Sequence, residues 1–504
     1  MLSRADELQD KPALIDGPSG RVLTYGELRS SIHAVAAGLA ARGFEKGDVF
    51  ATFAPNAPEY AIAFHGVASA GGINTTINPL YTADELCFQL KDSGARFLLT
   101  VPSFLDRALE GAERTGVEEV FVIGEGEGAT PFASLLEAGG DPPKVDIDPA
   151  EDLAVIPYSS GTTGLPKGVM LSHRNIVANL EQVGVVQRTS EEDVVIGVLP
   201  FFHIYGMTVV MNHSLHKGAT VVILPRFDLH QFLELLQEHE VTRANLVPPV
   251  VLALSKDPAV DDYEVSSLGV IISGAAPLGV ELADACAQRL GCMVIQGYGL
   301  TETSPVTHSS PETPDGNRPG SVGPSLPNTE VRVVDVEGGE DLSTGEDGEV
   351  WIRGPQVMRG YLNNEEETRD TVDEDGWLHS GDIGHVDEDG YLFLVDRLKE
   401  LIKYKGYQVA PAELEAVLIA HEAVADVAVI PCPDEEAGEI PKAFVVRSGE
   451  LEEDDVIAYA AERLSPQKKV RRVEFVDEIP KSPSGKILRR VLVEREREGQ
   501  AQGG

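Results

Sequence analysis

Positive charge is scarce in this sequence. Its 504 residues contain 82 Asp and Glu but only 41 Lys and Arg, which gives a formal net charge of −41 at pH 7. Nucleic acids and anionic membranes are bound by clustered lysine and arginine, so this balance argues against both as partners. The acidity is spread along the whole chain. It predicts a solvated surface of the kind expected in a salt-adapted (halophilic) organism, where salt screens the self-repulsion.

Cysteine is also rare, and its spacing carries no metal or redox motif. The four cysteines form neither a C-x-x-C pair nor a Cys/His cluster with the spacing of a zinc site. We therefore expect reduced, buried thiols of a cytosolic protein at Cys87, Cys286, Cys292 and Cys432.

Long apolar runs are missing as well. The N-terminal ten residues are polar and acidic and lack the apolar core of a signal peptide. The most apolar long window, residues 194–215, is interrupted by proline, glycine and two histidines, which predicts a buried element and a site loop instead of a membrane span. We expect a cytoplasmic protein without a transmembrane segment, and the sequence leaves both a monomer and a homodimer open.

A loop of small residues that ends in one lysine is the most informative segment. Residues 158–169 read Tyr-Ser-Ser-Gly-Thr-Thr-Gly-Leu-Pro-Lys-Gly-Val. Such a loop can curl so that backbone N–H groups and hydroxyls converge on an anion, and the lysine adds positive charge, which predicts a polyphosphate ligand. The residues expected to contact it are Ser159, Ser160, Gly161, Thr162, Thr163 and Lys167.

This loop differs from a Walker A loop, and its flanks predict that it is ordered. In the pattern G-x-x-x-x-G-K-S/T counted from Gly161, proline stands at position 166 and Gly168 follows the lysine. A buried strand is expected over residues 152–157, and a helix capped by Ser172 is expected after the loop. These flanks favour an ordered phosphate loop over a flexible linker.

Strand and helix patterns alternate up to about residue 330. Apolar β-branched runs occur at residues 48–53, 96–101, 120–123, 220–224, 268–272 and 292–296, with helical patterns between them. This alternation predicts layered α/β architecture with largely parallel sheets. From about Glu330, short strands separated by Glu-Gly, Asp-Gly and Gly-Glu turns predict a β-rich portion made of hairpins. The run Asp387-Glu-Asp-Gly390 is interpreted as a hairpin turn, because the full pattern of a calcium loop is missing.

The pattern restarts near residue 397. A lysine-rich segment is followed by an amphipathic helix over residues 412–420 and by strands over residues 424–430 and 443–446. We predict a large N-terminal domain over residues 1–396 and a small, mobile α+β domain over residues 397–504.

Two further glycine-punctuated segments follow predicted strands. Residues 273–278 read Ser-Gly-Ala-Ala-Pro-Leu, and residues 296–302 read Gln-Gly-Tyr-Gly-Leu-Thr-Glu. Open α/β sheets bind ligands where their strands end. Together with the phosphate loop, these segments would supply Tyr298 to stack a base, Thr301 to bond phosphate and Glu302 to hold Mg²⁺. Asp382, at the end of Trp-Leu-His-Ser-Gly-Asp, could accept hydrogen bonds from ribose hydroxyls.

In their order along the chain, these motifs resemble the adenylate-forming superfamily, in the branch of 4-coumarate:CoA ligases and acyl-CoA synthetases. The resemblance spans nearly the whole chain, including Leu199-Pro-Phe-Phe-His-Ile-Tyr205 and Pro480-Lys-Ser-Pro-Ser-Gly-Lys486. One motif alone is a moderate signal, but the ordered set is highly specific. The resemblance implies a ligase that converts a carboxylic acid, ATP and CoA to acyl-CoA, AMP and pyrophosphate through an acyl-adenylate, with Mg²⁺ as cofactor.

The resemblance also implies where the chemistry occurs. Lys486 would lie between the acyl carboxylate and the α-phosphate, where two anions meet and negative charge accumulates. His203 and Lys403 would contact the adenylate. A solvated tail lysine and a satisfied core histidine are the competing interpretations of Lys486 and His203. Similar enzymes rotate the small domain after adenylation about a hinge that corresponds to Lys399, which removes Lys486 and presents the face from Lys403 to Gln408.

The same resemblance implies the remaining contacts. The nucleotide is expected at Ala275, Gln296, Gly297, Tyr298, Thr301, Asp382, Arg397, Lys399 and Gln408. CoA is expected at Arg226, Lys405 and Gly406. The acyl group is expected at Tyr205, Val209, Ile272, Gly274, Gly297, Pro305 and Val306.

One acyl-pocket position departs from part of the family. Relatives that activate hydroxycinnamates can carry lysine at the position of Ile272, where it can meet a ring hydroxyl. Isoleucine donates no hydrogen bond, which favours a fatty acid or an aryl acid without that hydroxyl over 4-coumarate itself.

Other functions share some of these motifs. An adenylation domain that loads a carrier protein with an amino acid would place an acidic residue near positions 203–207, but the stretch reads His-Ile-Tyr-Gly-Met. A nucleotide-binding regulator would be expected to lack Lys486 or Glu302, and both are present. A luciferase-like adenylating oxygenase has the same motifs and stays open as an alternative.

Overall fold

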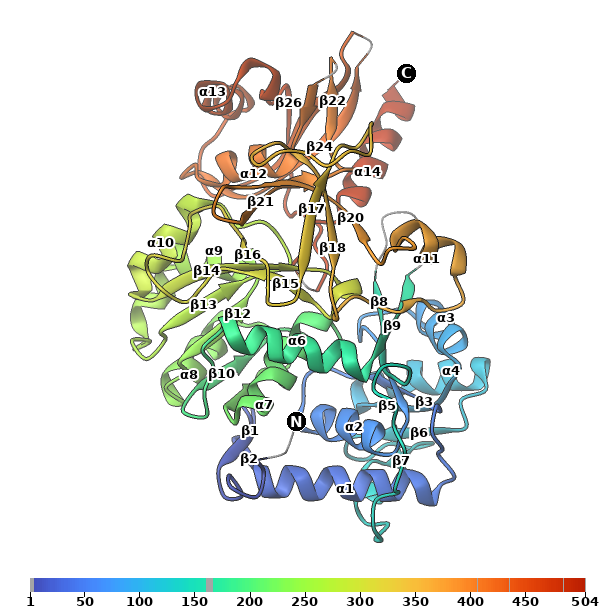
Figure 1. Cartoon of the computed structure of the whole chain (residues 1–504). Helices are drawn as coiled ribbons and strands as arrows, with labels where there is room; N and C mark the ends of the chain where they lie inside the picture. Colours follow the sequence, from blue (N-terminus) through green and yellow to red (C-terminus); the bar gives the residue numbers. More distant parts are fainter. Residues whose placement is uncertain (1–3, 160–165, 406, 435, 484, 504) are drawn as a thin grey trace.

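The computed structural model describes residues 4–159, 166–405, 407–434, 436–483 and 485–503. They form a large body, drawn from blue through yellow to light orange, and a small body that carries the C-terminus, drawn in darker orange to red (Figure 1). Two eight-stranded sheets and a five-stranded sheet lie in the large body, and another five-stranded sheet lies in the small one. The predicted layered α/β class with a β-rich portion is confirmed.

Parallel strands form the centre of the first eight-stranded sheet. In spatial order its strands are β19 (Gly360–Tyr361), β9 (Lys167–Ser172), β8 (Leu153–Ser159), β4 (Ile73–Thr76), β3 (Val49–Phe53), β5 (Ala95–Thr100), β6 (Glu119–Val122) and β7 (Thr130–Pro131). From β8 to β7 all pairs are parallel, whereas β9 and β19 add in antiparallel fashion at one edge. The phosphate loop therefore connects two antiparallel neighbours, β8 and β9.

The second eight-stranded sheet follows the same plan. In spatial order its strands are β15 (Val306–Ser309), β14 (Met293–Gly299), β13 (Val270–Ser273), β12 (Arg243–Leu246), β10 (Val194–Gly197), β11 (Thr220–Ile223), β1 (Pro12–Asp16) and β2 (Arg21–Thr24). Only the two outermost pairs, β14–β15 and β1–β2, are antiparallel. Because β13 and β14 are parallel neighbours, the two glycine-punctuated segments that follow them lie side by side.

Helices of the large body are positioned by recognisable end signals. They are α1 (Tyr25–Ala41), α2 (Pro58–Ser69), α3 (Ala83–Ser93), α4 (Leu105–Thr115), α5 (Ala133–Leu136), α6 (His173–Val186), α7 (Ser214–Lys217), α8 (Leu229–Glu238), α9 (Pro248–Lys256), α10 (Val280–Leu290) and α11 (Glu365–Thr371). Ser172 caps α6 as predicted, since its side chain accepts the N–H of Asn175. Thr24 and Thr82 form capping boxes on α1 and α3.

The most apolar window of the sequence, residues 194–215, contains a buried helical element. Residues Tyr205–His213 form a π-helical segment whose side chains are all buried. Among the helices of the described residues, none combines the length and the apolarity that a membrane span requires. All four cysteines lie within the described chain, where none of them forms a disulfide; Cys87, Cys286 and Cys432 are buried and Cys292 is partly exposed.

The five-stranded sheet of the large body consists of hairpins, as predicted. Its order is β16 (Gly323–Pro324), β21 (Tyr391–Arg397), β20 (Leu378–Val386), β18 (Gly348–Arg353) and β17 (Glu330–Val334), and every pair is antiparallel. The turn between β20 and β21 is the Asp387-Glu-Asp-Gly390 run.

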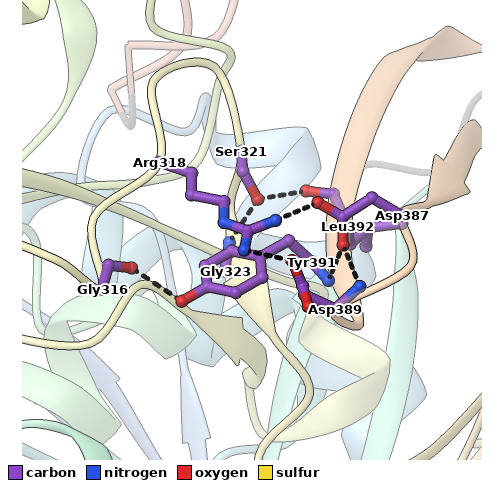
Figure 2. Close-up of polar contacts among 8 residues, drawn as sticks. All are labelled: Gly316, Arg318, Ser321, Gly323, Asp387, Asp389, Tyr391 and Leu392. Atoms are coloured by element: carbon purple, nitrogen blue, oxygen red, sulfur yellow. Dashed lines mark hydrogen bonds and ion pairs between the residues drawn. The ribbon is translucent and has the colours of Figure 1, made fainter.

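This turn is fixed by an arginine and carries the contacts of a hairpin (Figure 2). Arg318 binds Asp387 and Asp389, and its guanidinium lies 4.0 Å from the centre of the Tyr391 ring. The Tyr391 hydroxyl donates to the carbonyl of Gly316 at 3.0 Å, and Ser321 Oγ donates to the carbonyl of Leu392 at 2.8 Å. The loop before β16 is thereby attached to the β20–β21 hairpin, whose far end forms part of the functional site.

The small body has its own hydrophobic core. Its sheet has the order β23 (Tyr407–Val409), β22 (Ile402–Tyr404), β25 (Gly438–Arg447) and β24 (Val424–Asp434), with β26 (Arg472–Phe475) paired to β25. Its helices are α12 (Pro411–Ile419), α13 (Glu453–Arg463) and α14 (Arg489–Gly503). Leu414, Val427, Val445 and Val456 belong to a core cluster that contains only residues after 401. This separate core fits the predicted small domain, although the boundary at residue 396 stays a prediction.

Candidate functional site

A cavity of about 670 Å³ lies where the sheets of the large body meet the small body. Its walls come from the strand ends of β8, β13 and β14, from the loop before Tyr205, from α11, from residues 397–399, and from Ser482, Pro483, Lys486 and Leu488. The carboxyl ends of parallel strands are where open α/β sheets bind ligands. Most of the predicted site residues, which are far apart in sequence, are brought together here.

One end of the cavity carries the start and the end of the phosphate loop. Ser159 ends β8, Lys167 begins β9, and the two residues are register partners. Ser159 Oγ and the Tyr361 hydroxyl donate to the same oxygen of Glu302, at 3.0 and 2.9 Å. Lys167 forms an ion pair with Glu367 of α11, and its Nζ lies 5.1 Å from the centre of the Tyr361 ring. The predicted loop residues Ser160, Gly161, Thr162 and Thr163 lie outside the described residues.

Tyr298 and Arg397 line the next wall and are joined by Asp382, which is buried and does not itself line the cavity. The Tyr298 hydroxyl donates to Asp382 Oδ2 at 2.6 Å, and Arg397 Nε lies 3.1 Å from Asp382 Oδ1. Register pairing of β20 with β21 places Asp382 opposite Arg397. Burial and the neighbouring Asp382 carboxylate hold the pKa of Tyr298 well above its usual value, so its hydroxyl keeps its proton. Asp382 in turn raises the pKa of Arg397. The predicted neighbours Ala275, Gly297, Thr301 and Lys399 also line the cavity.

His203 and Lys486 both line the cavity, and Lys486 is near enough to affect the charge of His203. Burial, with a smaller effect of Lys486, lowers the pKa of His203 to about 4, so His203 is neutral at pH 7. Its Nδ1 accepts the N–H of Tyr205 at 3.3 Å, which leaves Nε2 as the nitrogen that carries the proton. Burial first, and the positive charge of Arg397 second, lower the pKa of Lys486.

The turn that holds Lys486 is tied together by its own backbone. The N–H of Ser482 donates to the carbonyl of Lys486 at 2.8 Å, and the N–H of Lys486 donates to Ser482 Oγ at 3.1 Å. Gly485 has φ +77°, and a Cβ added there would lie 3.0 Å from Val247 Cγ2. Glycine is required here because a side chain would be strained and would also press on the large body. Lys486 is thus held by a specific turn, which contradicts the interpretation as a solvated tail lysine.

An apolar part of the cavity lies around Tyr205. Ile272, Gly274, Pro305 and Val306 line the cavity together with Tyr205. The Tyr205 hydroxyl donates to the carbonyl of Ile272 at 3.0 Å, which fixes the ring. A Cβ on Gly274 would lie 3.0 Å from that ring, so glycine keeps the pocket open. The predicted pocket residue Val209 is buried in the π-helical segment and does not line the cavity.

Several predicted contacts lie away from the cavity. Lys403 and Gln408 are register partners on the exposed β22–β23 hairpin, and Lys405 binds Glu436 at 2.5 Å. Arg226 is also exposed, and the predicted Gly406 lies outside the described residues. Gln296 is buried and accepts the N–H of Leu278 at 3.2 Å, so it supports the neighbouring turn instead of facing the cavity. Lys486 therefore lines the cavity, whereas Lys403 and Gln408 of the β22–β23 hairpin lie outside it.

The position of the small body is held by a lysine from the large one. Lys256, the last residue of α9, donates to the carbonyl of Ile419 at 3.1 Å and to that of Val424 at 3.4 Å. Ile419 ends α12, where helix carbonyls lack partners within the helix, so Lys256 caps α12 across the boundary between the bodies. Within the small body, Arg489 bridges Glu400 and Glu415 and so ties the start of α14 to the segment after β21 and to α12.

Sequence reasoning missed Tyr361 and Glu367. Tyr361 bonds Glu302, and Glu367 bonds Lys167, although these partners are 59 and 200 positions apart. The only signal in the sequence was the polar segment after Gly360. It could be placed only once β19 was known to pair with β9.

Comparison with known proteins places the chain in a family. The model of the AMP-binding enzyme family matches residues 2–362, and that of the AMP-binding enzyme C-terminal domain matches residues 413–486. 4-Coumarate–CoA ligase 5 of Oryza sativa subsp. japonica is 45% identical over 506 residues, covering 98% of this chain and 93% of the relative. 4-Coumarate–CoA ligase of Pinus taeda is 44% identical over 501 residues, covering 98% of this chain and 93% of the relative. The chain belongs to the AMP-binding enzyme family, and the predicted adenylate-forming resemblance is confirmed.

Solved structures agree over the whole chain. ATP-bound MatB from Rhodopseudomonas palustris matches with a TM-score of 0.88 at 32% identity, covering 98% of both chains. The anthranilate CoA ligase AuaEII in complex with anthranoyl-AMP matches with a TM-score of 0.91 at 28% identity, covering 99% of this chain and 97% of that one. A benzoate CoA ligase from Burkholderia xenovorans LB400 gives a TM-score of 0.88 at 26% identity, covering 97% of this chain and 98% of that one.

Proposed function

We propose that this protein activates a compact aryl acid without a ring hydroxyl. The chain is an ATP-dependent acid:CoA ligase, an acid–thiol ligase that works through an acyl-adenylate, as its relatives do. The observation that carries the choice of acid is the wall made by Ile272, which is apolar and buried and offers no donor to a hydroxyl. The ring of Tyr205, fixed by its hydrogen bond to the Ile272 carbonyl, limits the depth available to a long alkyl chain.

In the first half-reaction the carboxylate attacks the α-phosphate and pyrophosphate leaves. The Lys486 ammonium, beside Arg397 in the cavity, supplies positive charge where the two anions meet. Neutral His203 can donate from Nε2 to an oxygen of the acyl carboxylate or of the adenylate it becomes. Tyr298, Asp382 and Arg397 orient the nucleoside, and Lys167 with Ser159 holds the phosphates that leave.

Magnesium fits the donor set at the phosphate end. Mg²⁺ in phosphoryl-transfer sites is usually held by one or two carboxylates together with substrate phosphates. Glu302 presents one carboxylate to the cavity near Lys167. When bound there, the ion would neutralise part of the phosphate charge. Ser159 and Tyr361 position the Glu302 carboxylate through their hydrogen bonds.

In the second half-reaction the CoA thiolate displaces AMP. Rotation of the small domain, residues 397–504, about Lys399 would remove Lys486 and bring in Lys403, Lys405, Gly406 and Gln408. Arg226 on the large body would contact CoA. A Lys405→Glu variant should therefore keep acid-dependent ATP–pyrophosphate exchange near the wild-type rate while thioester formation from supplied acyl-adenylate falls by about ten- to a hundredfold. Glu436→Gln, which removes only the partner of Lys405, is the control and should leave both steps nearly unchanged.

A panel of acids tests the proposal directly. Benzoates, cinnamate, 4-coumarate and short and long alkyl acids would be assayed for AMP and thioester formation, with and without CoA, at low and molar salt. Cinnamate or a benzoate without a ring hydroxyl should be preferred to 4-coumarate by at least about tenfold in kcat/KM. A long alkyl acid as the best substrate would contradict the aryl assignment and support fatty acid metabolism. Activity that persists in molar salt would support a cytoplasm rich in salt as the setting for this acidic surface.

A further inference from the structure

Glu367, for which the sequence predicted no role, binds the lysine at the end of the phosphate loop. Glu367 binds Lys167 directly, and the Lys167 side chain is only 15% exposed. The Tyr361 ring covers the same ammonium at 5.1 Å, and the Tyr361 hydroxyl reaches Glu302 at 2.9 Å. Lys167 is therefore enclosed by a carboxylate on one side and an aromatic ring on another.

The position of Glu367 is set by the helix that carries it. Asn364 caps α11 by accepting the N–H of Glu367, and Thr368 Oγ1 accepts the N–H of Tyr361 at 2.8 Å. These bonds attach α11 to β19, which pairs with β9, the strand that begins at Lys167. Glu367, Asp370 and Thr371 face the cavity, whereas the preceding Glu366 is exposed and does not line it.

Glu367 and a nucleotide phosphate would both bind the Lys167 ammonium. The Lys167 ammonium offers three donors, but its burial restricts the directions from which an anion can approach. A polyphosphate that reaches Lys167 must either displace the Glu367 carboxylate from the ammonium or share the ammonium with it. If both anions bind the same ammonium, they lie close together and repel each other.

We infer that Glu367 competes with the β- and γ-phosphates of ATP for Lys167 and so weakens ATP binding. This inference rests on the proposed role of Lys167 in nucleotide binding. Glu367 acts as a positioning residue, since it reaches the nucleotide through Lys167. AMP has no β- or γ-phosphate, so its binding is independent of this competition. The arrangement lowers the affinity for ATP and leaves that for AMP unchanged.

Binding calorimetry on the full chain tests the inference without acid or CoA. The dissociation constants of Mg·ATP and of AMP would be measured for the wild type, Glu367→Gln, Glu367→Ala and Glu366→Gln. Glu366→Gln removes the same charge one residue away, from an exposed side chain that does not line the cavity, and is the matched control. Each titration would be done at about 0.1 M and about 1 M salt, where the screening length falls from about 10 Å to about 3 Å.

Both Glu367 variants should bind Mg·ATP about three- to fivefold more tightly at the lower salt, in line with the worth of a partly exposed ion pair. At the higher salt the difference should fall below about twofold, and AMP binding and the control should stay within about twofold throughout. Unchanged or weaker Mg·ATP binding, or equal tightening for ATP and AMP, would overturn the inference.

Failure of the proposed function gives a different result. A wild type that binds Mg·ATP and shows the Glu367 effect but forms no thioester from any acid would contradict the ligase proposal alone. A wild type that does not bind Mg·ATP would overturn this inference as well.

Discussion

Two lysines that line the cavity have contrasting surroundings. Lys167 is paired with Glu367 and lies against Tyr361, at the start of strand β9. Lys486 lies on a turn of the small body, where burial and the positive charge of Arg397 lower its pKa. A lysine with a carboxylate partner is already neutralised before the reaction, so an incoming phosphate must compete for it and gains the same contact in the ground state and in the transition state. A lysine beside another cation gains most when negative charge develops next to it.

The largest expected effect comes from removing the second lysine. Lys486→Ala should lower the rate of acid-dependent ATP–pyrophosphate exchange by about a hundred- to a thousandfold, because a donor to the developing charge is lost. Thioester formation from supplied acyl-adenylate should continue. Lys481→Ala is the control from the same turn, since Lys481 pairs with Asp426 at 2.6 Å and does not line the cavity. Pyrophosphate release at the wild-type rate in Lys486→Ala would show that the role is misassigned.

A smaller and different effect is expected for the first lysine. Lys167→Ala should raise KM for ATP by about tenfold and leave kcat within about threefold, because Lys167 holds phosphate in the ground state as well as in the transition state. Initial rates over a range of ATP concentrations measure both. An equal loss in kcat would remove the distinction between the two lysines.

The pH dependence should sharpen the contrast. Lys486 must be charged to act, so adenylation should fall as the pH rises through its pKa, which lies below the usual value for lysine. Arg397→Gln removes the neighbouring positive charge, which should raise that pKa and move the alkaline limb of log kcat to higher pH. The profile would be measured at saturating ATP. A limb that does not move would mean that another group controls it.

The smallest expected effect concerns stability away from both lysines. Burial lowers the pKa of His308 to about 3, so between about pH 6.5 and pH 3 the unfolded chain takes up a proton that the folded protein does not. Stability is therefore lost as the pH falls through this window. In His308→Asn the fall in Tm between pH 7 and pH 5 should be smaller than in the wild type, by a few degrees. Identical falls would contradict the neutral, buried state of His308.

Much of the fold was predictable because its local signals are strong. The serine cap of α6, the alternation of apolar strands and helices, and the Asp-Gly turn at residue 390 each depend on neighbours in sequence. Resemblance to a family placed Lys486, His203 and Arg397 in one site, and the structure brings all three to the same cavity.

The rest depended on tertiary pairing. The contact of Glu367 with Lys167 requires the register of β19 on β9. The direction of the Gln296 side chain is set by its hydrogen bond from Leu278 in the neighbouring turn. Neither is encoded by spacing along the chain. The cap that Lys256 provides for α12 likewise joins the two bodies, and their relative position cannot be predicted from local sequence patterns.

The central claim is that Lys167 binds phosphate whereas Lys486 accelerates adenylation. Its most direct test is to measure single-turnover adenylation by Lys167→Ala and by Lys486→Ala at rising ATP concentration, with the acid in excess. We predict that saturating ATP restores Lys167→Ala to within about threefold of the wild-type rate and leaves Lys486→Ala slower by at least about a hundredfold. If saturating ATP restores the adenylation rate of both variants, or of neither, the assignment of separate roles to the two lysines is contradicted.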